Sequence, residues 1–98
     1  MDGELSITLK YFATIREITG KKEELLSLEK GHSVMDLLTK LAEIYGEKMS
    51  QFIFDGKREP RENLTFLING QAIKSENLNE RKLKDGDTFV ILPPISGG

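Results

Sequence analysis

The sequence predicts a single α+β domain, in which one main helix packs across a mixed sheet of about five strands. Two strand-like segments precede one amphipathic stretch, and three strand-like segments follow it. A chain of 98 residues is the size of one domain with one modest core. The order of elements places the first strand beside the last in the middle of the sheet. We expect residues 1–92 to form the domain and residues 93–98 to form an extended tail.

The first strand is predicted over residues 5–12, where apolar and polar side chains alternate with period two. Phe12 interrupts this pattern, because it places an aromatic ring on the otherwise polar face. A short helical turn is expected over 13–19, and a second strand over 24–28. The side chains expected to face the core are Leu5, Ile7, Leu9 and Tyr11 from the first strand and Leu26 and Leu28 from the second.

The main helix is predicted over residues 34–45. Ser33 is the expected N-cap, and Asp36 three residues later completes a capping box. Gly46 supplies the stop. A second short helix is expected over 47–54. One stripe of the main helix consists of Val34, Leu37, Leu38, Leu41 and Tyr45, and the short helix offers Met49, Phe52 and Ile53 for burial.

The second half of the chain predicts a hairpin and a final strand. Asn69-Gly70 is the strongest hairpin signal, because a type I′ turn needs positive φ at both central residues. Pro93-Pro94 ends the last strand, since neither ring can donate a hydrogen bond to a ladder. The expected elements are a loop at 55–63, strands at 64–68 and 71–74, a helical or 3₁₀ turn at 78–83, a tight turn at 84–87 and a strand at 88–92.

The composition excludes several classes of chemistry. The chain has no cysteine and one histidine, which removes disulfides, thiolate metal sites, a thiol nucleophile and a His-rich metal cage. Fourteen basic residues against 16 acidic residues argue against non-specific nucleic-acid binding. No apolar run approaches a membrane span, and the N-terminus shows no signal peptide, so we expect a cytoplasmic protein without a membrane partner.

The internal charged residues favour a solvated surface over a catalytic site. No pair of carboxylates has the spacing of an acid–base dyad on a helix face, and His32 stands alone in a loop. A basic phosphate patch at residues 57–61 is the weaker alternative, because acidic residues lie among the basic ones. The carboxylates considered are Glu23, Glu24, Asp36, Glu43, Glu47, Asp85 and Asp87, and the mixed loop consists of Asp55, Lys57, Arg58, Glu59, Arg61 and Glu62.

The tail is the most informative segment. Six residues from Pro93 to Gly98 reach about 20 Å when extended. Gly97 and Gly98 permit close approach to another protein because they have no side chains. A terminal carboxylate has a pKa of about 3.3–3.7, so it is ionised and needs activation, for example as an acyl-adenylate. A frayed end is the alternative interpretation. This pattern indicates a carrier whose working group is its own C-terminus.

At this point the chain resembles the MoaD/ThiS family of ubiquitin-like sulfur carriers, most closely its MoaD branch. Small archaeal modifier proteins and the eukaryotic carrier Urm are also similar. The resemblance implies the β-grasp fold, which agrees with the element order. The motifs that carry it are Pro93-Pro94-Ile95-Ser96-Gly97-Gly98, Lys84-Asp85-Gly86-Asp87, Asn69-Gly70 and Tyr11-Phe12-Ala13 with Arg16-Glu17.

The resemblance implies a carrier that is not an enzyme on its own and binds no cofactor or metal. An E1-like enzyme would use ATP-Mg to adenylate the Gly98 carboxylate. A sulfur donor such as a cysteine desulfurase would then convert it to a thiocarboxylate. The tail would enter a MoaE-like large subunit of molybdopterin synthase and deliver sulfur for the molybdenum cofactor. Alternatives are thiolation of a thiamine precursor or tRNA, conjugation of Gly98 to target lysines, and an interaction module with an idle tail.

A partner-binding face is implied as well. On the last strand, Phe89 and Ile91 would face the helix, whereas Thr88, Val90 and Leu92 would face outward. Family members carry a hydrophobic patch there, and its positions match Phe12, Ala72 and Leu92 of this chain. Ala72 and Leu92 are smaller than the residues that better-known family members carry at those positions. The sulfur acceptor and the oligomeric state stay open. The expected partner-binding residues are Phe12, Ala72, Val90, Leu92, Pro93, Pro94, Ile95 and Ser96.

Overall fold

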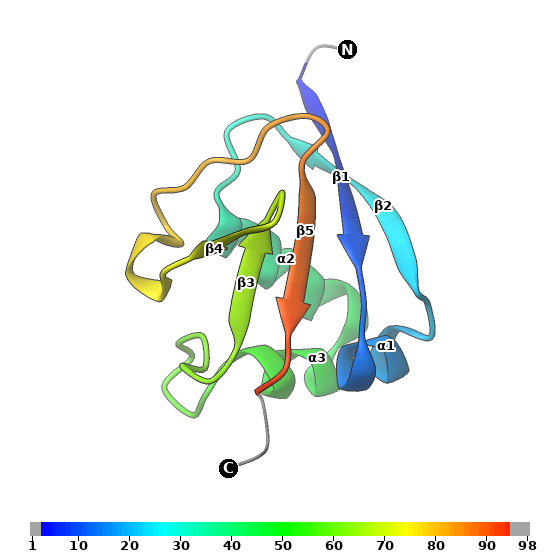
Figure 1. Ribbon diagram of the computed structural model, residues 1–98, viewed down its shortest axis with the longest axis vertical. Coiled ribbons are helices and arrows are strands. Elements are labelled where there is room, and N and C mark those ends of the chain that lie inside the picture. The colour runs from blue at the N-terminus through cyan, green and yellow to red at the C-terminus, as the bar shows by residue number, and fades with distance from the viewer. Residues whose placement is uncertain (1–2, 95–98) are drawn as a thin grey trace.

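The computed structural model describes residues 3–94 (Figure 1). Its order of elements follows the predicted one, with a short helix between the first two strands, the main helix after them and three strands in the second half. The strands are β1 (Glu4–Lys10), β2 (Glu23–Glu29), β3 (Thr65–Ile68), β4 (Gln71–Ile73) and β5 (Thr88–Leu92). The helices are α1 (Ala13–Thr19), α2 (Val34–Tyr45) and α3 (Glu47–Ile53), with one 3₁₀ turn at Ser75–Asn77.

The five strands form one mixed sheet in the order β2-β1-β5-β3-β4. The central strand β5 is parallel to β1, with Leu9 opposite Phe89, and antiparallel to β3, with Leu67 opposite Val90. The first strand therefore lies beside the last, as predicted. Helices α2 and α3 lie behind the sheet in Figure 1, so that one sheet face is covered and the other is open.

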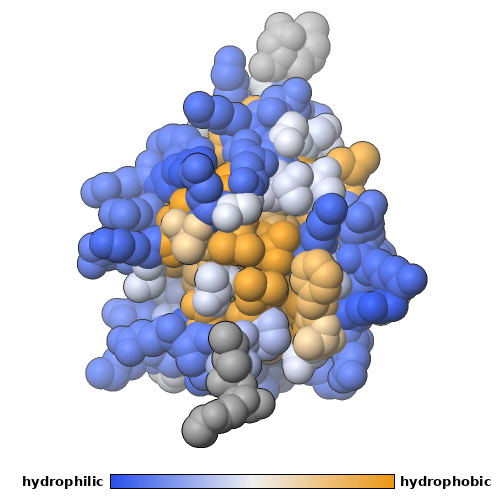
Figure 2. Space-filling model, in the orientation of Figure 1, coloured by the Kyte–Doolittle hydropathy of each residue, from blue (hydrophilic) through white to orange (hydrophobic). Residues whose placement is uncertain are grey.

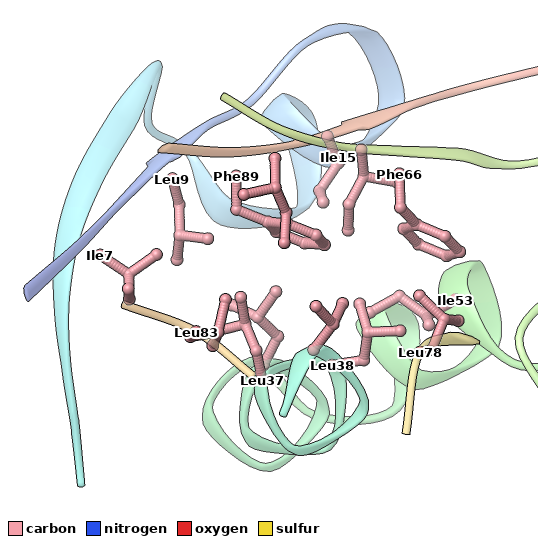
Figure 3. Close-up of a cluster of buried hydrophobic side chains, with 14 of the residues drawn as sticks. Ile7, Leu9, Ile15, Leu37, Leu38, Ile53, Phe66, Leu78, Leu83 and Phe89 are labelled. Atoms are coloured by element: carbon pink, nitrogen blue, oxygen red, sulfur yellow. The ribbon is translucent and has the colours of Figure 1, made fainter. Parts of the chain in front are cut away.

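The core lies between the sheet and α2. In Figure 3, the apolar side chains of α2, such as Leu37 and Leu38, face the inward side chains of the central strands, such as Phe89. The fold is stabilised because this packing removes apolar surface from water. Phe66 and Phe89 stack with ring centroids 6.1 Å apart. All four inward residues predicted for β1 and its continuation are buried. The largest fully buried side chains are Phe66, Phe89, Ile7, Leu9, Ile15, Leu37, Leu38, Leu41, Met49, Ile53, Ile68 and Leu78.

The predicted ends of α2 are confirmed. The Ser33 hydroxyl accepts a hydrogen bond from the Asp36 amide at 3.2 Å, and the Asp36 carboxylate accepts one from the Ser33 amide at 2.8 Å. Gly46, at φ 85°, ends the helix with its amide on the Ala42 carbonyl. In the hairpin between β3 and β4, Asn69 and Gly70 have φ values of 51° and 85°, as a type I′ turn requires.

The helical or 3₁₀ turn expected at 78–83 is misplaced, because the structure has the 3₁₀ turn earlier, at Ser75–Asn77, and the amides of Leu78, Glu80 and Arg81 donate back to the carbonyls of that turn. Carbonyls of residues 78–83 bond to the start of α2. The Leu78 carbonyl accepts from the Met35 amide at 3.0 Å, and the Arg81 carbonyl accepts from the Val34 amide at 2.9 Å. These carbonyls satisfy donors that a helix N-terminus leaves free. The segment is therefore used as a cap.

The first strand is also shorter than predicted, since β1 ends at Lys10. Phe12 is the residue before α1 and has extended backbone angles. Among residues 3–94, no helix is long and apolar enough to cross a membrane.

Candidate functional site

The open face of the sheet carries a band of apolar side chains, which we call the apolar strip: Phe12, Leu67, Ala72, Val90 and Leu92. The strand register brings it together, because Val90 lies opposite Leu67, and Leu67 lies opposite Ala72. Figure 2 shows the apolar surface at the centre of this face with hydrophilic residues around it. The strip is a surface suited to a protein partner.

Alternation along β5 explains why the strip exists. Phe89 and Ile91 are buried, whereas Val90 and Leu92 are only partly buried, as predicted. Phe12 joins the strip from two residues beyond the end of β1 and is 45% exposed. Ala72 is exposed on β4. The structure thus places the four predicted sheet-face residues on one surface.

Leu67 belongs to this surface, although the sequence analysis did not select it. It lies on β3 between the buried residues Phe66 and Ile68 and is partly buried. Three consecutive apolar residues in a strand indicate that both faces are covered, and this signal could have identified Leu67. Leu25 of the edge strand β2 lies opposite Thr8 of β1, faces the open side of the sheet and is 72% exposed.

The root of the tail lies next to the strip. Pro93 is partly buried and Pro94 is exposed, and both border a hollow of about 400 Å³. Arg61 lies in this hollow, with its Nε donating to the Gln51 carbonyl at 2.9 Å. The other lining residues are Thr14, Gln51, Phe52, Asn63 and Leu64. Ile95, Ser96, Gly97 and Gly98, which the sequence analysis selected, lie outside the described residues.

Glu24 is not part of the solvated surface that the sequence predicted. Its carboxylate accepts hydrogen bonds from the Tyr11 hydroxyl, from the Tyr45 hydroxyl at 2.5 Å and from Lys21 Nζ at 2.9 Å. Burial favours the neutral acid, but the three donors outweigh it and hold the pKa of Glu24 below its ordinary value. Burial and the nearby carboxylate raise the pKa of Tyr11. These hydrogen bonds connect β2 to α2 at the edge of the sheet. We therefore assign the cluster a structural role.

Asp87 is a second correction, because it is buried. It accepts hydrogen bonds from the Lys84 amide at 2.8 Å and from Asn69 Nδ2 at 2.9 Å, while Asn69 Oδ1 accepts from the Thr88 amide at 3.0 Å. Asp85 accepts from the Ser6 amide at 2.7 Å. The turn at 84–87 thus uses its carboxylates to fix the entry into β5.

The other candidates of the sequence analysis form no catalytic cluster. The His32 ring Nδ1 lies 2.8 Å from the Glu29 carbonyl. The Ser33 amide holds the pKa of Asp36 below its ordinary value. Asp55 folds its own loop by accepting from the amides of Lys57 and Glu59. Within residues 3–94, no three His, Asp or Glu side chains are placed to hold a metal ion.

Comparison with known proteins decides the family. The model of the ThiS family matches residues 9–98, which is nearly the whole chain. The chain belongs to the ThiS family. As a ThiS-family protein it is 31% identical over 94 residues to small archaeal modifier protein 3 of Haloferax volcanii. It is 29% identical over 94 residues to the molybdopterin synthase sulfur carrier subunit of Chlamydomonas reinhardtii. Each alignment covers 96% of this chain and 100% of the relative.

Solved structures confirm the predicted β-grasp fold for this ThiS-family protein. Small archaeal modifier protein 1 of Methanosarcina acetivorans is 37% identical, with a TM-score of 0.77 and coverage of 97% of this chain and 98% of that one. The complex of subunits 1 and 2 of the molybdopterin-converting factor of Helicobacter pylori supplies a further match in fold, at 22% identity and a TM-score of 0.62. That match covers 96% of this chain and 100% of the other. The relatives are small carrier or modifier proteins.

Proposed function

We propose that this protein is a sulfur carrier that acts through the carboxylate of Gly98 in the synthesis of molybdopterin. The observation that carries the proposal is the family match, which extends through Gly97 and Gly98. The relative named as a molybdopterin synthase sulfur carrier subunit supports the same role. In the fold, the apolar strip lies beside Pro93 and Pro94, so a partner bound there can receive the tail.

The proposed chemistry takes place on partners. The Gly98 carboxylate attacks the α-phosphate of ATP-Mg on an E1-like enzyme, forming an acyl-adenylate and releasing pyrophosphate. The adenylate turns a poor electrophile into a reactive one, because AMP is a good leaving group. The outer sulfur of a donor persulfide, such as that of a cysteine desulfurase, then attacks the acyl carbon, expels AMP and forms an acyl persulfide. A second thiol of the partners reduces its S–S bond, which releases the thiocarboxylate and leaves a disulfide on the partners. The tail delivers this sulfur to the pterin precursor inside a MoaE-like large subunit. This chain supplies the carboxylate and the docking surface.

The side chains and the location of the strip are suited to docking a partner protein. The strip combines an exposed aromatic ring at Phe12 with the partly buried aliphatic side chains of Val90 and Leu92, a mixture that favours protein contacts. Because β5 is the central strand, it is paired with β1 as far as Val90 and with β3 as far as Leu92. A partner that covers the strip therefore meets the tail at a fixed starting point. The H. pylori structure, which pairs subunits 1 and 2 of the converting factor, supports a two-protein arrangement of this kind.

A second function, conjugation of Gly98 to lysines of target proteins, is favoured by a specific observation. The two small archaeal modifier proteins described above are 31% and 37% identical to this chain, whereas the two molybdopterin proteins described above are 29% and 22% identical. The same adenylate serves both routes, with a lysine amine instead of sulfur displacing AMP. The two roles differ only in the nucleophile, so one protein can perform both.

Intact-mass measurement tests the carrier function. The protein is incubated with an E1-like enzyme, ATP-Mg and a sulfur donor, and we expect a mass gain equal to the replacement of one oxygen by sulfur. Deletion of Gly98 is the matched negative control and should abolish the gain. A wild-type chain that forms neither adenylate nor thiocarboxylate with active partners refutes the proposal. A Gly-Gly remnant on lysines of other proteins after protease digestion identifies the modifier route.

A further inference from the structure

A second concave surface lies on the helical side of the molecule. It is a hollow of about 850 Å³ between α2, α3 and the loop at 54–60, and we call it the helical groove. Helices α2 and α3 lie behind the sheet in Figure 1, whereas the apolar surface of the open face is seen in Figure 2, in the same orientation. The carrier function proposed above makes no use of this groove, so an inference about it stands apart from that function.

The floor of the groove is apolar. Met35 and Ala42 of α2, together with Phe54 and Pro60 from the loop, line it and are all partly buried. Met35 and Phe54 also pack against the core, which holds these two side chains in place. A partner that places apolar side chains here removes further apolar surface from water.

The rim of the groove is acidic. Four lining residues are carboxylates, Glu43, Glu47, Asp55 and Glu59, and one is a guanidinium, Arg58. Within residues 3–94, none of these four carboxylates forms an ion pair. The charge of an occupant should complement this rim, so lysine and arginine side chains are favoured and acidic ones are opposed.

The backbone around the groove favours a helix as the occupant. An extended peptide gains affinity by adding to a free strand edge, whereas a helix satisfies its own backbone. Apart from Asn79, the lining residues of this groove come from α2, α3, Gly46 between them and the loop at 54–60. The loop bonds internally, because the Asp55 amide donates to the Glu59 carbonyl and the Arg58 amide donates to the Asp55 carbonyl. The groove follows α2 from Met35 to Gly46, which is about 16 Å at 1.5 Å per residue, or about three turns of a partner helix.

We propose that the helical groove binds an amphipathic helix of a partner protein, with apolar side chains over Ala42 and Phe54 and with lysine or arginine along the acidic rim. Because the groove and the apolar strip lie on opposite faces of the sheet, a helix bound here leaves the strip free. The protein can therefore hold one partner by its helical side while another partner occupies the strip and the tail.

A peptide titration of the full chain tests this proposal. The probe is a synthetic amphipathic helix of leucine and lysine, and its control replaces every lysine with glutamate. In NMR spectra of the labelled protein, we expect the lysine peptide to shift the amides of Thr39, Ala42, Gly46 and Ser50, which line the groove. Shifts centred on Val90 and Leu92, or equal binding of the glutamate peptide, overturn the proposal.

Two variants locate the binding energy. Charge reversal of the rim by E43K, E47K and E59K together should weaken binding of the lysine peptide about tenfold or more. Each exposed ion pair contributes modestly, but the three contributions are lost together. A matched control reverses three exposed glutamates elsewhere by E4K, E17K and E29K, which gives the same change in net charge, and it should keep wild-type affinity. An equal loss in both triple variants refutes the site.

The second variant, Ala42→Lys, places a long cation over the floor and keeps a residue with good helix propensity. We expect it to abolish binding of the lysine peptide while the far-UV circular dichroism stays that of the wild type. A folded Ala42→Lys chain with unchanged affinity also overturns the proposal.

Discussion

Replacing Tyr45 with phenylalanine removes one of the three donors to the Glu24 carboxylate. The hydroxyl lies 2.5 Å from Glu24 Oε2, and a hydrogen bond to a charged group contributes about 1.5–3 kcal/mol. Glu24 keeps its bonds from Tyr11 and Lys21, so we expect a loss near the lower end, about 1.5 kcal/mol. For a domain of this size, that loss lowers the midpoint of thermal unfolding by about 6–12 °C.

The pH dependence separates this cause from a general packing defect. The folded protein holds the pKa of Glu24 below its ordinary value of 4.5. The stabilisation is therefore fully present above pH 4.5 and is lost as the pH falls through the folded pKa. Thermal unfolding followed by circular dichroism should show a larger difference between Tyr45→Phe and wild type at pH 7 than at an acid pH below 4.5, and the difference should shrink as the pH is lowered further.

Thr39→Val provides the matched control, since it removes an exposed hydroxyl from the same helix. It should leave the midpoint unchanged at either pH. An unaltered midpoint for Tyr45→Phe at pH 7, or an equal decrease at both pH values, refutes the role assigned to the Glu24 cluster.

Three further outcomes are expected. Leu92→Asp should weaken binding of an E1-like partner, measured by calorimetry, by about tenfold or more. Ile44→Asp, at an exposed apolar residue of α2 outside the strip, should have a smaller effect, and equal losses contradict the strip as the docking surface. Asp87→Ala leaves the Lys84 amide and Asn69 Nδ2 without their acceptor and should cost about 2–3 kcal/mol in urea unfolding, so an unchanged midpoint is evidence against that network. Ser33→Ala should cost about 1 kcal/mol and speed hydrogen exchange at the Asp36 amide, and slow exchange there argues against the cap.

The sequence was sufficient to predict most of the fold because local signals and burial agree there. The alternation that buries Ile7 and Leu9 also sets the outward face of the strand, and the capping box at Ser33 sets the start of α2. The type I′ turn at 69–70 follows from residue type alone. Such signals act within a few residues, so they survive without knowledge of the tertiary structure.

The errors of the sequence analysis lie where the partner is distant in the chain. Glu24 accepts a hydrogen bond from Tyr45, which lies 21 positions away in the sequence. The carbonyls at 78–83 accept hydrogen bonds from the start of α2, which lies more than 40 positions away. No local pattern reports such pairings, and a lone carboxylate then looks solvated. The apolar strip stands between these cases. Alternation predicted Val90 and Leu92, and the family resemblance implied Ala72, but the register of three strands shows that Leu67 lies between them on the same surface.

The parallel pairing of β1 with β5 has a mechanical consequence. The chain enters β1 at one end of the sheet and leaves β5 at the opposite end (Figure 1). A force that draws Pro94 away from Glu4 therefore runs along both strands and loads the bonds of their ladder together, in shear. The antiparallel ladder between β3 and β5 shares that load. A partner that binds the end of the chain thus pulls on the central strand, which is paired on both sides. We therefore expect the domain to stay folded while the tail is under tension.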